Sequence, residues 1–186
     1  GKYKDYAIYL PLCKEQTEQL GAMISEILET SKLGEDIENE PAQAFDAAAH
    51  VSALSDPYKM IAQANGQQFK VKLEDCIPVS LPANMFSKAL SNVLSNAVAY
   101  TEYGKTISVY AIGRELIVEN ECLPIPEEQL KHIFEPFYRP DYARNRRDGG
   151  NGLGLYIVAS ILDNLGVKYS FASMTKPDGM SFKIEL

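Results

Sequence analysis

Histidine and cysteine are scarce in this chain of 186 residues, which has only two histidines and three cysteines. His50 and His132 lie far apart, and the cysteines Cys13, Cys76 and Cys122 are also scattered. No CxxC pair or histidine cluster therefore has the spacing of a zinc or haem site. An odd number of dispersed cysteines is also typical of a reducing compartment, where disulfides do not persist.

Long apolar runs and an excess of positive charge are missing as well. No run of about eighteen or more apolar residues occurs and no signal segment is recognisable, so we expect these residues neither to span a membrane nor to direct export. The 18 basic residues against 25 acidic ones give a net charge of −7. This negative net charge argues against general binding to nucleic acid or to a membrane surface. A site for an anion would therefore need a local cluster of positively charged groups. The first residue is Gly1, as expected for a piece of a longer chain.

Length and composition predict one globular domain with a modest appendage, since 46% of the residues are hydrophobic and 23% charged. At the N-terminus, residues recur at spacings of four and three, as in the seam of a helix packed in a bundle or coiled coil. The seam consists of Tyr6, Leu10, Cys13, Thr17, Leu20, Ile24, Ile27 and Ser31. Gly34 is expected to stop this helix, and residues 35–41 to form a linker. We therefore predict two parts, residues 1–40 and 41–186.

The remaining residues alternate between helical and strand patterns. Helices are predicted after an Asp46 cap to residue 64 with an interruption at Pro57, over 85–100 with Asn84 as cap, after Pro126, and over 152–165. Strands are predicted over 68–73, 77–81, 106–112, 115–119, 167–173 and 180–186, with hairpin turns at 113–114 and 178–179. This mixture predicts an α+β fold, a two-layer α/β sandwich with helices on one face of a mixed, mainly antiparallel sheet.

A glycine-rich segment, residues 149–155, leads directly into the last predicted helix. Glycines there let backbone amides approach a phosphate at the positive end of the helix. Basic residues that would neutralise phosphate oxygens come just before it, namely Arg139, Arg144, Arg146 and Arg147. Taken singly, the glycines also fit a flexible loop and the arginines a solvated one. Together they predict a loop that closes over a polyphosphate.

Asn92 and Asn96 are four residues apart on the predicted 85–100 helix, so their amides point the same way. An amide oxygen is a suitable ligand for Mg²⁺, which takes few protein ligands and completes its shell with water and phosphate. The alternative is a pair of exposed helix asparagines. Tyr100, one turn further on, either stacks on a base or packs in the core.

In this order, the motifs resemble the ATP-binding catalytic domain of bacterial sensor histidine kinases, which shares its fold with gyrase, Hsp90 and MutL. Residues 90–97 (LSNVLSNA) resemble that family's N box, residues 134–139 (FEPFYR) its F box and residues 150–155 (GNGLGL) its G2 box. The N-terminal helix is similar to the second helix of the family's dimerisation hairpin, and residues 183–186 to its last strand. The run 137–144 also resembles the vancomycin-resistance sensor kinases.

The resemblance implies a Bergerat-type fold preceded by a long bundle helix, with ATP and Mg²⁺ as ligands. Asn96 would hold the metal, adenine would lie against Asn120 and Tyr100, and lid amides and arginines would hold the phosphates. The implied nucleotide-binding residues are Asn92, Asn96, Tyr100, Asn120, Ile125, Phe134, Arg139, Arg144, Gly150, Gly152, Leu153, Gly154, Leu155 and Ser181.

The resemblance also implies an activity and partners. The γ-phosphoryl group would pass to a histidine and then to an aspartate in the receiver domain of a response regulator. The protein would form a homodimer through the N-terminal helix, would bind no nucleic acid, and would be membrane-anchored at full length with this part at the cytoplasmic face.

The sequence departs from the family pattern at two places. Residues 120–126 (NECLPIP) stand where the family has Asp-x-Gly-x-Gly, so Asn120 replaces the aspartate that accepts from the adenine amino group. In the same segment Cys122 and Pro124 replace glycines. Ala99 stands where many members carry a phosphate-binding lysine. These departures leave open a degenerate nucleotide-binding or dimerisation module with little affinity for ATP.

In the family, an acidic residue directly follows the histidine that accepts the phosphoryl group. Neither histidine of this chain has such a neighbour, since Val51 follows His50 and Ile133 follows His132. We expect both to be structural, the acceptor to lie upstream of residue 1, and this chain to contain no catalytic residue and not to phosphorylate itself. A gyrase-type ATPase or an anti-sigma-type serine kinase would share the pocket, but the N-terminal helix and the F box disfavour both.

Overall fold

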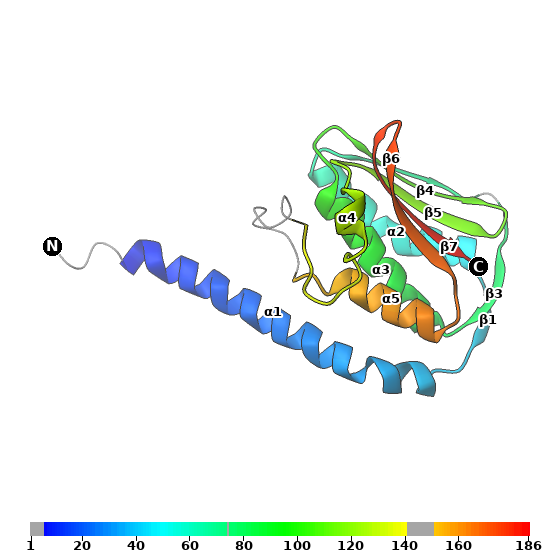
Figure 1. The fold of residues 1–186 in the computed structure, drawn as a ribbon, viewed down its shortest axis with the longest axis horizontal. Coiled ribbons are helices and arrows are strands. Elements are labelled where there is room, and N and C mark those ends of the chain that lie inside the picture. The colour runs from blue at the N-terminus through cyan, green and yellow to red at the C-terminus, as the bar shows by residue number, and fades with distance from the viewer. Residues whose placement is uncertain (1–5, 74, 141–150) are drawn as a thin grey trace. The chain divides into compact units, whose positions relative to one another are not determined.

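The computed structural model describes residues 6–73, 75–140 and 151–186 of the chain (Figure 1). It divides the chain into two compact units, residues 1–36 and 37–186; the predicted boundary near residue 40 stays a prediction. The first unit is most of one long helix, α1 (Tyr6–Asn39). The helix runs past Gly34, so the predicted stop there is wrong. A glycine inside a helix costs only about 1 kcal/mol, and the helical residues on either side outweigh it.

The second unit is built on a five-stranded sheet with strand order β2-β4-β5-β7-β6. The strands are β2 (Gln68–Lys72), β4 (Thr106–Ile112), β5 (Glu115–Glu121), β6 (Tyr169–Thr175) and β7 (Asp178–Glu185). Only the β2–β4 pair is parallel, and the other neighbours are antiparallel. A separate two-stranded sheet pairs β1 (Gln43–Asp46) with β3 (Pro78–Leu81).

Three helices, α2 (Ala47–Ala64), α3 (Ala83–Tyr100) and α5 (Gly154–Asn164), cover one face of the five-stranded sheet (Figure 1). A fourth, α4 (Glu127–Leu130), is a single turn. Successive side chains along each strand point to opposite faces of the sheet. The register places Val109, Val118 and Phe182 on the helix-covered face, where all three are buried. The predicted α+β sandwich is confirmed.

A carboxylate begins α2 as predicted. Asp46 accepts hydrogen bonds from the backbone N–H of Ala48 at 3.1 Å and of Ile77 at 2.8 Å, so it both caps the helix and ties it to the start of β3. The helix is not interrupted at Pro57, which lies inside it. Ala53, whose carbonyl loses its partner because proline has no N–H, is exposed, so water can satisfy that carbonyl.

The start of α3 differs from the prediction. The cap position is Pro82, which has no side-chain hydrogen bond to offer, and Asn84 lies inside the helix. The N–H of Asn84 instead donates to Glu40 Oε1 at 2.8 Å. A carboxylate far upstream in the sequence therefore satisfies a free amide at the end of α3.

The last hairpin turns at residues 176–177, not at the predicted 178–179. Gly179 already belongs to β7 and pairs with Glu121 of β5. A Cβ on Gly179 would lie 2.2 Å from the carbonyl oxygen of Asn120. This glycine is thus required by the close approach of two strands rather than by a turn. The turn predicted at 113–114 is confirmed between β4 and β5.

Candidate functional site

The two asparagines of the LSNVLSNA motif lie beside the first residue of α5. A Cβ on Gly154 would be 3.2 Å from Asn92 Oδ1 and 3.6 Å from Asn96 Nδ2. Asn92 Nδ2 donates to the carbonyl of Lys88 at 2.9 Å, and its Oδ1 faces α5. Packing of α3 on α5 therefore brings two amide groups to the N-terminal end of a helix, where free backbone N–H groups lie.

The segment just before α5 is bonded to the FEPFYR motif. The N–H of Phe137 donates to the carbonyl of Gly152 at 3.0 Å. Gly152 has a φ of +77°, and a Cβ there would lie 2.8 Å from backbone atoms of Phe137 and Tyr138. Glycine is therefore required at 152 both by its conformation and by the space available. Phe137 also has a positive φ, of 65°.

Three further predicted residues, Ile125, Phe134 and Leu155, belong to one apolar cluster. Its buried members are Cys122, Ile125, Ile133 and Met180, and packed against them are Leu130, Phe134, Tyr138, Leu155 and Phe171. The backbone of Ile125 is held on both sides, because its N–H donates to Met180 Sδ at 3.4 Å and its carbonyl accepts from Ser173 Oγ at 2.7 Å. Leu153 is also buried, with 2% exposure.

Asn120 lies near the end of β5, opposite Ile107 of β4 and Met180 of β7. It shares the helix-covered face with Val118 and is only 8% exposed. Its Nδ2 is buried and has no hydrogen-bond partner among the residues that the structure describes. A buried polar group left unpaired costs about 1–3 kcal/mol. A ligand that offered an acceptor here would remove that cost.

Ser181 does not join Asn120. The register pairs Ser181 with Glu119, whose neighbour in sequence is Asn120, and adjacent strand residues point to opposite faces. Ser181 Oγ lies 3.4 Å from Glu119 Oε1, on the face away from the helices. The structure therefore does not support a contact of both residues with one nucleotide.

The other predicted residues stand as follows. Tyr100 is half-buried at the C-terminal end of α3, one turn beyond Asn96. Arg139 is half-buried and follows Tyr138. Arg144 and Gly150 lie outside the described residues. Sequence reasoning missed the roles of Phe137 and Gly179, whose partners are distant in the chain, so no local pattern pointed to them.

Both histidines have local partners. His50 Nε2 lies 2.6 Å from Ser87 Oγ on α3, and its ring packs against those of Phe45 and Phe86. His132 Nδ1 lies 2.7 Å from Glu135 Oε1 and is about half-exposed. These contacts agree with the structural roles expected for the two residues.

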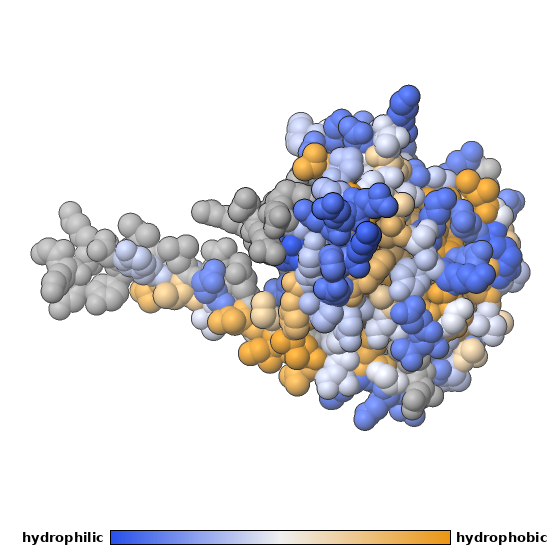
Figure 2. All heavy atoms as spheres, in the orientation of Figure 1, coloured by the Kyte–Doolittle hydropathy of each residue, from blue (hydrophilic) through white to orange (hydrophobic). Residues whose placement is uncertain are grey.

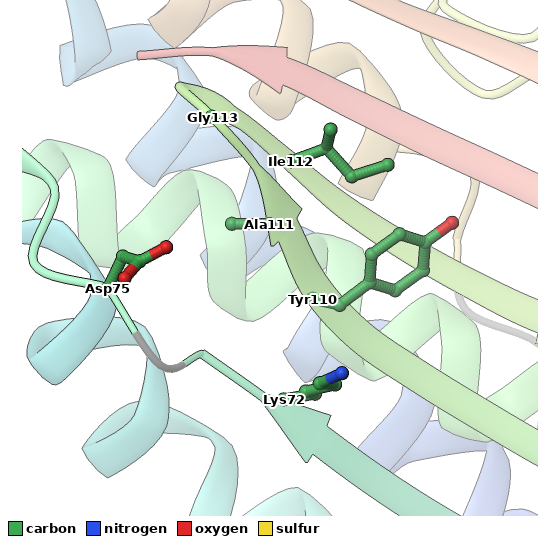
Figure 3. A pocket seen from close by; sticks show the side chains of 6 residues that line it. All are labelled: Lys72, Asp75, Tyr110, Ala111, Ile112 and Gly113. Atoms are coloured by element: carbon green, nitrogen blue, oxygen red, sulfur yellow. The ribbon is translucent and has the colours of Figure 1, made fainter.

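A hollow of about 300 Å³ lies elsewhere, at the ends of β2 and β4 (Figure 3). It is lined by Lys72, Asp75, Tyr110, Ala111, Ile112 and Gly113, none of which is a predicted site residue. Within residues 6–73, 75–140 and 151–186, no group of three or more histidine, cysteine, aspartate or glutamate side chains is placed to hold a metal ion. No helix in the same ranges is long and apolar enough to cross a membrane.

Residues 83–186, which run from α3 through β7, match the family model described as "Histidine kinase-, DNA gyrase B-, and HSP90-like ATPase". The chain belongs to this family. Its relatives place it with the bacterial sensor histidine kinases, as the motifs indicated.

The chain is 35% identical over 190 residues to Sensor protein VanSB of Enterococcus faecalis, a match that covers all of this chain and 42% of that protein. It is 32% identical over 152 residues to Sensor histidine kinase CusS of Escherichia coli, covering 80% of this chain and 32% of that protein. The chain thus spans less than half the length of these curated relatives.

Among solved structures, the chain resembles full-length ShkA in complex with AMPPNP, with a TM-score of 0.75 and 20% identity over 96% of this chain and 38% of that one. It also resembles the Acinetobacter baumannii histidine kinase AdeS, with a TM-score of 0.68 and 20% identity over 97% and 85% of the two chains. At this identity the likeness shows the fold alone.

Proposed function

We propose that this chain binds Mg-ATP beside α3 and α5 and is the nucleotide-binding part of a protein-histidine kinase. The observation that carries the proposal is the position of Asn92 and Asn96 beside Gly154, where a Cβ would lie 3.2 Å from the first amide and 3.6 Å from the second. It joins a helix N-terminus, which attracts phosphate, to two amide oxygens, which suit Mg²⁺. The family match covers both elements.

The residues present fit the proposed ligands. The absence of a side chain at Gly154 leaves room between the α5 terminus and the two amides, room that a Cβ would begin to fill. Backbone N–H groups at the start of α5 would hold phosphate oxygens, and Asn96 Oδ1 would hold Mg²⁺, which neutralises charge on the β- and γ-phosphates. Arg139 and Arg144 would add positive charge on the lid side of the phosphates.

The base would lie toward Asn120, Ile125 and Tyr100. Asn120 supplies a side-chain N–H donor that has no partner in the part of the chain that the structure describes. Ile125 belongs to the same apolar cluster as Leu155 and Phe134, so this residue is connected to the start of α5 through one core. Cys122 is buried in this cluster, where a glycine would leave a void.

Phosphoryl transfer depends mainly on positioning and on stabilising charge, so no nucleophile or base is needed from this chain. His50 and His132 both lack the expected acidic neighbour and have local partners. We therefore place the acceptor histidine in another part of a longer protein. From there the phosphoryl group would pass to an aspartate of a response regulator receiver domain. The longer protein would be a membrane-anchored homodimer, with this part at the cytoplasmic face.

Calorimetry with a non-hydrolysable ATP analogue and Mg²⁺ tests the site. The wild-type chain should bind the analogue, and Gly154→Val should weaken binding at least about tenfold, because the added carbons displace Asn92 and Asn96. Gly21→Ala is the control, since nothing lies within 4 Å of a Cβ there. Circular dichroism checks that each variant folds. An absence of heat from the wild type at millimolar analogue would favour the degenerate module instead.

Incubation of the purified chain with ATP labelled at the γ-phosphate tests the missing acceptor. No acid-labile label should appear on the chain itself. A label on His50 or His132 would contradict the proposal that the acceptor lies elsewhere.

A further inference from the structure

Strand β2 forms an outer edge of the five-stranded sheet. Among the residues that the structure describes, it pairs only with β4. The N–H of Gln68 donates to the carbonyl of Lys105, just before β4, at 2.8 Å. Because backbone groups alternate in direction along a strand, the even-numbered residues of β2 bond toward β4. Phe69 and Val71 therefore direct their N–H and C=O groups away from the sheet, where a further strand can pair with them.

The two faces of this edge differ in chemistry. The register places Val71 opposite Val109 on the helix-covered face, and Val71 is 36% exposed there. Lys70 and Lys72 lie on the other face and are exposed. Residues directly opposite each other in neighbouring strands share a face. A strand added to β2 would therefore set alternate side chains beside the lysines and the others beside the valine, which favours a strand that alternates acidic and apolar residues.

The hollow of Figure 3 lies at the C-terminal end of this edge. Lys72, the last residue of β2, lines one side of it, and residues 110–113 of β4 and its turn line another, with Asp75 beside them. Its volume is about 300 Å³. The hollow leaves room for a side chain of an added strand that extends past Lys72.

We propose that β2 is a docking edge for an extended segment of another protein, in which acidic side chains alternate with apolar ones. Backbone hydrogen bonds to Phe69 and Val71 would supply the pairing, as when a peptide adds a strand to a sheet edge, and the lysines would select the acidic face. A second copy of β2 suits this edge poorly, because antiparallel pairing centred on Lys70 or Val71 places lysines opposite one another. The proposal does not depend on nucleotide binding beside α3 and α5.

Fluorescence anisotropy with capped, labelled peptides tests this edge. One peptide alternates glutamate with valine and a second alternates lysine with valine, so the two differ in charge at the same positions. The chain should bind the glutamate peptide at least about fivefold more tightly, since opposite charges across strands attract and like charges repel. A third peptide, the glutamate peptide with methylated backbone nitrogens, keeps its charges but cannot donate to β2. It should bind at least about fivefold more weakly than its unmethylated form.

Two substitutions assign the binding to β2. Val71→Pro removes an N–H that points away from β4, so the β2–β4 pairing should survive while the glutamate peptide binds at least about fivefold more weakly. Lys70→Glu should lower or reverse the preference for the glutamate peptide. Lys131→Glu, at an exposed position after α4, brings the same change of charge and should leave the preference as it is. Circular dichroism checks that each variant folds.

Three results would overturn the proposal. Equal binding of the glutamate and lysine peptides, or full binding of the methylated one, would do so without any variant. If the chain binds neither charged peptide, the lysines only keep the edge from pairing with other strands. If Val71→Pro and Lys70→Glu fold and bind as the wild type does, the peptide lies elsewhere than on β2. Calorimetry with the ATP analogue decides the proposed function separately, so either proposal can fail while the other stands.

Discussion

At the scale of single residues, Tyr110 shows how one side chain ties stability to pH. It is half-buried on the sheet face away from the helices, and its hydroxyl donates to Glu119 Oε1 at 2.9 Å. Burial, followed by this bond to a carboxylate, raises the pKa of Tyr110 from 10.0 to about 12. Burial and Asp163 raise the pKa of Tyr169 to about 12 as well.

Between pH 10 and pH 12, the unfolded chain has ionised tyrosines while folded Tyr110 still keeps its proton. The folded state then binds more protons, so stability falls as the pH rises. We expect Tyr110 to account for a loss of roughly 1–3 kcal/mol in the free energy of unfolding over this range. Urea unfolding at several pH values should show a smaller loss for Tyr110→Phe. Tyr103→Phe, at a side chain that is 86% exposed, is the control, and an equal loss in both variants would contradict the assignment.

At the scale of elements, two helices of the second unit, α2 and α3, are held at their N-terminal ends by acidic side chains. Asp46 caps α2 and also accepts from the N–H of Ile77, the residue just before β3. Glu40 bonds the N-terminal end of α3. The Glu40 bond therefore holds the N-terminal end of α3, and the proposed metal ligand Asn96 lies further along the same helix.

Glu40→Ala should lower the free energy of unfolding by about 0.5–1.5 kcal/mol, because it removes the acceptor for the Asn84 N–H and the charge near a helix N-terminus. Denaturant titration measures this change. Glu40→Gln keeps an oxygen acceptor and should recover part of the loss. Glu102→Ala, at an exposed site, should change stability by less than about 0.5 kcal/mol. An equal effect of the Glu40 and Glu102 substitutions to alanine would show that the bond contributes nothing.

At the scale of the whole molecule, α1 carries a row of exposed apolar side chains, part of the orange surface in Figure 2. Leu10, Leu20 and Ile24 are 65%, 58% and 57% exposed, and Ile27 is 42% exposed. All four belong to the predicted heptad seam. Cys13, Thr17 and Ser31 of the seam are also exposed, while nothing is described of the Tyr6 side chain. An apolar row of this kind is typical of a helix that packs on a second copy.

We expect the chain to self-associate through α1. Sedimentation velocity at increasing concentration should show dimers for the wild type and mainly monomers for Ile24→Asp, because a charge inside the seam would be buried without a partner. Ser25→Asp adds the same charge one residue away, off the seam, and should still form dimers. A wild-type monomer at high concentration would contradict the role of α1.

Much of the fold and part of the site follow from local patterns. The capping aspartate of α2, the 3.6-residue period of α3 and the β4–β5 hairpin depend on residues close together in the chain, and all three are confirmed. Three local interpretations are wrong. Gly34, Asn84 and Gly179 were assigned to a stop, a cap and a turn, but in the structure a helix continues, a distant carboxylate supplies the cap, and a strand approaches. Strand β1 was not predicted, since its four residues have no alternation of their own.

The sequence by itself determined the order of elements and the identity of the three motifs, because helix and strand periods and motif spacing are properties of neighbouring residues. Only the tertiary structure decided which motif residues meet. Asn92 and Asn96 reach Gly154 because α3 packs on α5, and Ser181 is turned away from Asn120 because strand register is set by pairing between distant segments. The Nδ2 of Asn120, which has no partner among the described residues, is likewise a property of burial, which depends on every neighbour at once.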